Sequence, residues 1–160
     1  MRYPLRVVHY LNQFFAGIGG EEKANMPVQV QEGPQGPGKI LQQMLKDQGE
    51  VVATIVCGDN YCNEEEEKAR TTIEEALQRI RPDVVIAGPA FNAGRYGLAC
   101  AVVCKAAQKT GIPAVTGMHP ENPGVGQARG AGIVVPTGST AVEMQPALST
   151  MARLAVKLGK

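Results

Sequence analysis

The chain has 160 residues, a formal net charge of +1 from 16 Lys and Arg against 15 Asp and Glu, and 44% hydrophobic residues. This balance argues against a strongly basic nucleic-acid binder and against an acidic disordered protein. The length suits one domain with its own core, no apolar run approaches the roughly 20 residues of a membrane span, and the first residues show no signal-peptide pattern. We therefore expect a single domain, residues 1–160, in a cytoplasmic protein with no nucleic-acid or membrane partner.

Glycine and proline are abundant, at 19 and 11 residues, but they gather between apolar runs, for example at residues 33–38 and 117–120. Such clusters indicate turns between elements rather than low-complexity disorder. Loops of this kind are where a small domain often holds its functional residues.

The first third of the chain predicts two strands and one helix. Residues 6–10 and 51–56 are short, continuous runs rich in Val and Ile. Runs that do not alternate with polar residues are typical of parallel strands covered on both faces. Between these strands the sequence predicts a long irregular stretch, residues 11–37, and a helix over about residues 38–47.

The rest of the chain alternates helices with further short strands. The clearest helix begins at Asn63, a good N-cap, has a run of Glu in its first turn and stops before Pro82. The final helix runs to Leu158, and Pro146 either sits in its first turn or kinks it. Between these two helices the sequence predicts a strand at 84–87, a well-buried helix at 94–110, and strands at 114–116 and 133–135.

This order of elements predicts the fold. Strands that alternate with helices form α/β layers with right-handed crossovers. We expect a doubly wound three-layer α/β sandwich of flavodoxin- or Rossmann-like type, with a mainly parallel sheet of about five strands. In such a sheet the ligand crevice lies beyond the carboxyl ends of the strands, where the polar loops of this sequence should converge.

Arg95 is the strongest candidate for binding in these loops. It stands at the start of the helix that follows the third strand, where free backbone N–H groups and a guanidinium group suit a carboxylate. The alternative is an ion pair of Arg95 with Asp59 or Glu21 across the loops.

Nucleotide and metal sites find less support. Six residues separate Tyr10 from the glycines at 17–20, so these glycines do not match the dinucleotide fingerprint, and no phosphate-binding loop motif is present. The Cys residues lie in or beside apolar segments without zinc-knuckle spacing, which favours small buried side chains over a metal site. They stand at positions 57, 62, 100 and 104.

The loop sequences resemble those of a known family. The segments concerned are VVHYLNQFFAGIGGEEKA (residues 7–24), CGDNY (57–61), AGPAFNAGRYG (87–97), VTGM (115–118) and ENPG (121–124). They are similar to the N-terminal part of the selenoprotein B subunit of the glycine/sarcosine/betaine reductase family, and the resemblance spans nearly the whole chain.

The resemblance implies a role in reductive deamination, which ends in acetyl phosphate. In that family component B binds a small amino acid, a pyruvoyl group on a partner subunit forms a Schiff base with a primary amine, and a selenocysteine selenolate displaces the nitrogen. The carboxymethyl product passes to selenoprotein A. The sequence contains no selenocysteine, and family members are considerably longer, so we expect an N-terminal domain that is inactive alone and works in an oligomeric complex.

The resemblance and the position of the loops point to the same polar residues. Arg95 and Asn92 are predicted to bind the substrate carboxylate or the adjoining domain, and His9 or Glu21 to handle protons near the reacting nitrogen. Two alternatives stay open: a non-catalytic assembly module that docks the pyruvoyl subunit or selenoprotein A, and a flavodoxin-like nucleotide binder. The other predicted substrate-binding residues are Asn12, Gln13, Asp59 and Tyr96.

Overall fold

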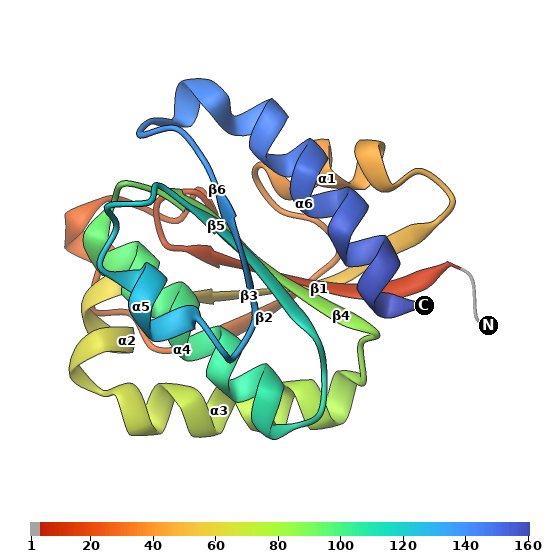
Figure 1. Cartoon of the computed structure of the whole chain (residues 1–160). Coiled ribbons are helices and arrows are strands. Elements are labelled where there is room, and N and C mark those ends of the chain that lie inside the picture. Colours follow the sequence, from red (N-terminus) through yellow and green to blue (C-terminus); the bar gives the residue numbers. More distant parts are fainter. Residues whose placement is uncertain (1–3) are drawn as a thin grey trace.

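The computed structural model describes residues 4–160, which fold around a six-stranded sheet in the order β2-β3-β1-β4-β5-β6 (Figure 1). All neighbouring strands are parallel except β2, which runs antiparallel to β3 at one edge. The strands are β1 (Leu5–Asn12), β2 (Gln29–Glu32), β3 (Gly49–Cys57), β4 (Val84–Phe91), β5 (Ala114–Met118) and β6 (Ile133–Pro136).

Helices cover both faces of the sheet, which confirms the predicted doubly wound α/β sandwich (Figure 1). One face packs against α1 and α6 through residues such as Leu41 and Leu148, and the other packs against α3 and α4 through Ile73 and Val103. Within residues 4–160, no helix is long and apolar enough to cross a membrane. The helices are α1 (Gly38–Leu45), α2 (Asp59–Glu64), α3 (Glu66–Ile80), α4 (Gly94–Lys109), α5 (Gly124–Ala128) and α6 (Met144–Gly159), with 3-10 turns η1 (Glu21–Lys23) and η2 (Ala141–Glu143).

The centre of the sheet is β1, which pairs with β3 on one side and with β4 on the other. Tyr10 lies opposite Ile55 of β3 and Ala87 of β4. Since the chain first winds to the β3 side and then crosses to β4, the strand order reverses between β1 and β4. Ligands of such folds bind beyond the carboxyl ends of the strands at this point.

The stretch at residues 11–37, predicted to be irregular, contains η1 and β2. The sheet therefore has six strands rather than about five. The sequence of β2 is polar, with Val30 as its one apolar residue, so its pattern gives no strand signal. It forms because β3 offers a free edge, along which Gln31 lies opposite Thr54. The short helix α5 was not predicted either.

The predicted start of a helix at Asn63 is wrong. The chain already turns into α2 at Asp59, so Asn63 lies inside that helix, and α3 begins at Glu66. The helical chain starts at Asp59 rather than at Asn63 because Asp59 and Cys62 are buried, so that tertiary contacts hold α2 in place without a strong capping residue. The end of α3 is as predicted: it stops at Ile80, before Pro82.

The end of β4 and the start of α6 can also be compared with the prediction. Residues 88–91, expected in a loop, belong to β4, which continues to Phe91. Pro146 is the third residue of α6 and so lies in its first turn, where its missing N–H group is tolerated.

Candidate functional site

The carboxyl ends of β1 and β3 are joined by side chains that were predicted to form the site. Asn12 donates from Nδ2 to Asp59 Oδ2 at 3.0 Å, and the Asp59 backbone N–H donates to Gln13 Oε1 at 3.1 Å. Asn12 also accepts a hydrogen bond from the Phe15 backbone N–H at 2.9 Å. All three side chains are buried. They fix the start of α2 against the loop that leaves β1.

Asp59 is a buried carboxyl group, with 6% of the residue exposed. Burial raises its pKa, while the hydrogen bond from Asn12 and the charge of Arg95 act in the opposite direction. Its second oxygen, Oδ1, is buried without a hydrogen-bond partner among the described residues. Asp59 is thus held in place beside the site, in surroundings that disfavour its charge.

Arg95 lies in the first turn of α4 and reaches across to the other loops. Its guanidinium group is ion-paired with Glu21 and donates a hydrogen bond to the Asn60 side chain. Both partners of the ion pair are exposed, Arg95 at 46% and Glu21 at 72% of their side chains. Of the two sequence interpretations, the structure shows the ion pair with Glu21 directly, and carboxylate binding by Arg95 stays a prediction.

The start of α4 leaves hydrogen-bond donors available. The first N–H groups of a helix have no acceptor within the helix, and no side chain of the described residues caps this end. No acidic residue stands in the first turn. Asn92, which precedes the helix, is exposed, and its backbone N–H lies 3.4 Å from the Ser139 carbonyl oxygen. This helix end stands beside the reversal of strand order, with the positive end of its dipole at the sheet edge.

His9 and Tyr96 are enclosed in the core rather than exposed at the sheet edge. The His9 ring is fully buried, with Nε2 2.8 Å from the Gly88 carbonyl oxygen, and burial lowers its pKa to about 4. Tyr96 is buried too, with its ring stacked on Phe15 at a centroid distance of 5.7 Å. Neither side chain reaches the surface in this structure. A proton-transfer role for His9 and substrate binding by Tyr96 stay predictions.

Several asparagines take part that were not predicted as site residues. Asn63 donates to the Asp59 carbonyl oxygen at 2.8 Å and to the Arg95 carbonyl oxygen at 3.0 Å, so it ties α2 to the start of α4. Asn122, after β5, holds the turn that precedes α4. Asn60 stands next to Asp59 in the segment at 57–61, and Asn122 stands in the segment at 121–124 that also carries the family resemblance, which was the available signal.

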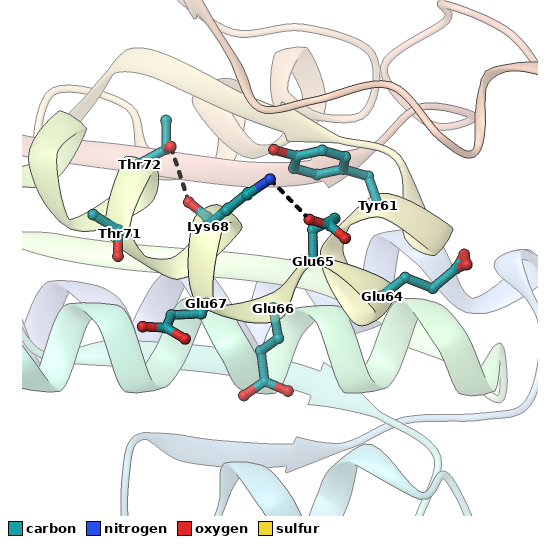
Figure 2. A pocket seen from close by; sticks show the side chains of 8 residues that line it. All are labelled: Tyr61, Glu64, Glu65, Glu66, Glu67, Lys68, Thr71 and Thr72. Atoms are coloured by element: carbon teal, nitrogen blue, oxygen red, sulfur yellow. Dashed lines mark hydrogen bonds and ion pairs between the residues drawn. The ribbon is translucent and has the colours of Figure 1, made fainter.

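A separate acidic hollow of about 680 Å³ lies over α2 and α3 (Figure 2). It contains none of the predicted site residues. Lys68 pairs with Glu65 there at 3.2 Å, as the dashed line in Figure 2 shows. Its lining consists of Tyr61, Glu64, Glu65, Glu66, Glu67, Lys68, Thr71 and Thr72.

The four cysteines are free thiols, and all are buried, as predicted. Burial raises the pKa of Cys104 to about 12 and raises that of Cys100 as well. A neutral, enclosed thiol is a poor nucleophile. Among residues 4–160 no three His, Cys, Asp or Glu side chains are arranged so that they could hold a metal ion.

Comparison with known proteins adds the identity of the family. The family model described as glycine/sarcosine/betaine reductase selenoprotein B matches residues 4–160. The chain is 49% identical over 98% of its length to the sarcosine reductase complex component B subunit beta of Peptoclostridium acidaminophilum. It is 52% identical over 96% of its length to the glycine reductase complex component B subunit gamma of Symbiobacterium thermophilum. A third relative, the betaine reductase complex component B subunit beta of Peptoclostridium acidaminophilum, is 40% identical over 96% of the chain.

The chain spans 35 to 36% of the length of these relatives. No solved structure matches it significantly. The family match covers every described residue, including all the loops that form the polar sheet edge. The chain therefore belongs to the glycine/sarcosine/betaine reductase selenoprotein B family.

Proposed function

We propose that this chain is the N-terminal domain of the substrate-binding component B of a glycine, sarcosine or betaine reductase, and that its carboxyl sheet edge forms one wall of the substrate site. The observation that supports this most is the start of α4: an uncapped helix end with Arg95 in its first turn, beside the reversal of strand order. A small carboxylate suits this combination, because backbone N–H groups, the helix dipole and a guanidinium group all favour an anion.

The residues of this chain bind and orient the amino acid. Arg95 has donors beyond those it uses with Glu21 and Asn60, since a guanidinium group carries five N–H groups, and these face the carboxylate together with the first turn of α4. Asn92 stands beside them as a second donor. Glu21, exposed next to Arg95, accepts or returns a proton near the substrate nitrogen. Asp59 and Asn12 act indirectly, by holding the loops.

The bond-breaking groups come from elsewhere. The chain contains no selenocysteine, and its buried thiols do not suit a nucleophilic role. By family resemblance, a selenocysteine outside these 160 residues and a pyruvoyl group on a partner subunit supply that chemistry, and selenoprotein A receives the product. The isolated chain is therefore expected to be inactive.

The test is the substrate dependence of a complete reductase whose component B contains this chain. Arg95→Ala removes hydrogen bonds from a charged group, which contribute about 1.5–3 kcal/mol, and it should therefore raise KM for the amino acid by about 10- to 100-fold. The control is Lys23→Ala, which removes another exposed cation of the neighbouring loop and should leave KM unchanged. Wild-type KM in Arg95→Ala would refute the proposal.

Phe14 favours a second candidate, a non-catalytic module that docks the pyruvoyl-containing subunit. This aromatic residue follows β1 on the same edge and is 62% exposed, and aromatic residues are enriched at protein interfaces. If docking is the sole role, Phe14→Ser weakens assembly of the complex in sedimentation, and Arg95→Ala leaves KM unchanged once the complex is assembled.

A further inference from the structure

Asn122 is a buried asparagine whose whole side chain is used to hold one turn. The residue is 2% exposed. Its Nδ2 group donates to the Phe91 carbonyl oxygen at 2.9 Å and to the Ala93 carbonyl oxygen at 3.0 Å, and its Oδ1 accepts from the Gly124 backbone N–H at 2.9 Å. The two carbonyl groups flank Asn92. The amide therefore spans the turn that leads from β4 into α4.

This turn needs to be held. Phe91 has a φ of +52°, a left-handed conformation that is uncommon for a bulky residue. Ala93, two residues later, is the N-cap residue of α4, and its side chain makes no capping hydrogen bond. The positions of Phe91 and Ala93 together set the direction in which α4 starts, and with it the places of Asn92 and Arg95.

The Asn122 side chain is tightly packed, and two glycines make this packing possible. A Cβ atom on Gly97 would lie 2.0 Å from Asn122 Oδ1, and one on Gly124 would lie 2.3 Å from the Gly97 carbonyl oxygen. Both contacts are far inside van der Waals distance, so the amide occupies a slot that two glycines create between α4 and α5. In this slot the amide reaches both carbonyl groups.

We propose that Asn122 is a positioning residue for substrate binding: it sets the turn that presents Asn92 and Arg95 to the substrate carboxylate. This inference rests on the proposed function of the carboxyl sheet edge. It assigns to the segment after β5 a role in binding, although Asn122 itself is enclosed and does not contact the ligand.

The main variant is Asn122→Asp, in a complete reductase whose component B contains this chain. Aspartate keeps the shape and the acceptor for Gly124 but replaces the donor by an oxygen that repels the Phe91 and Ala93 carbonyl groups. We expect KM for the amino acid to rise about tenfold or more, because small displacements of binding groups weaken binding strongly. Asn25→Asp, at an exposed position of the neighbouring loop, controls for the added negative charge and should leave KM unchanged.

A second variant and a second measurement separate positioning from folding. Asn122→Ser loses the same donors without adding charge and should raise KM likewise. Hydrogen exchange of the backbone amides of Ala93 and Gly97, which donate to the carbonyl oxygens of Ala90 and Ala93, should become about tenfold faster in both variants, while exchange in β1 stays as in the wild type. A purely structural role would instead lower the melting temperature with unchanged KM and unchanged relative exchange, and that result would overturn the inference.

The outcome for Arg95→Ala distinguishes the two proposals. If Arg95→Ala raises KM but both Asn122 variants keep wild-type KM, positioning by Asn122 is refuted and the proposed function stands. If Arg95→Ala leaves KM unchanged, the proposed function fails, and the inference built on it falls with it.

Discussion

His9 makes the stability of this protein depend on pH in the acid range. The ring is fully buried on β1, with Nε2 2.8 Å from the Gly88 carbonyl oxygen, and burial lowers its pKa from 6.5 to about 4. The unfolded chain therefore binds a proton at a higher pH than the folded chain does. The contribution of the neutral His9 is complete above about pH 6.5 and is lost as the pH falls toward 4.

The magnitude follows from the two pKa values. Their difference, at about 1.36 kcal/mol per pH unit, corresponds to a loss of about 3 kcal/mol in the free energy of unfolding. This is a large part of the roughly 5–15 kcal/mol that stabilises a typical domain. Asp59 acts in the opposite direction, because burial raises its pKa and protonation relieves the penalty. A variant at His9 is needed to separate the two groups.

The assay is urea unfolding between pH 7.5 and pH 4.5, followed by circular dichroism, for the wild type and His9→Gln. Glutamine can keep the donor to the Gly88 carbonyl oxygen but does not titrate in this range. The wild type should lose about 2.5 kcal/mol more than the variant over this range, because pH 4.5 still lies above the pKa of the folded state. If the free energy of unfolding changed with pH in the same way for both proteins, His9 would make no contribution to the pH dependence, and the reasoning would be refuted.

Two further predictions concern packing and charge. Gly97→Ala should lower the free energy of unfolding by about 1–3 kcal/mol, because the added methyl group would collide with Asn122. The control Gly126→Ala, in α5 with open space around it, should be neutral or slightly stabilising. Equal urea midpoints for the two variants would contradict this prediction. Asp59→Asn should raise the melting temperature relative to the wild type more at pH 7 than at pH 4, because burial raises the pKa of the Asp59 carboxyl group and the stability cost of its ionised form therefore grows with pH. A pH-independent difference would show that burial does not disfavour its ionisation.

Local sequence pattern was sufficient for most of the fold. The continuous apolar runs of the parallel strands and the Pro residues that bound α3 and α6 act through short-range preferences, so they are readable without the tertiary structure. The strand β2 and the helix α2 were missed for the opposite reason. Gln29–Glu32 forms a strand because β3 supplies a partner, and α2 starts at Asp59 because Asn12 and Gln13 bind it there.

The same division applies to the candidate site. The sequence by itself indicated that polar residues such as Asn12, Asp59 and Arg95 lie near one edge of the sheet, because they stand at or after the carboxyl ends of strands, and strands of one parallel sheet end together. It did not determine which of them are exposed. Arg95 finds its partner Glu21 74 positions away, and His9, one residue before Tyr10, is enclosed beside Gly38 of α1. Exposure and pairing depend on contacts between distant segments, and these only the tertiary structure decided.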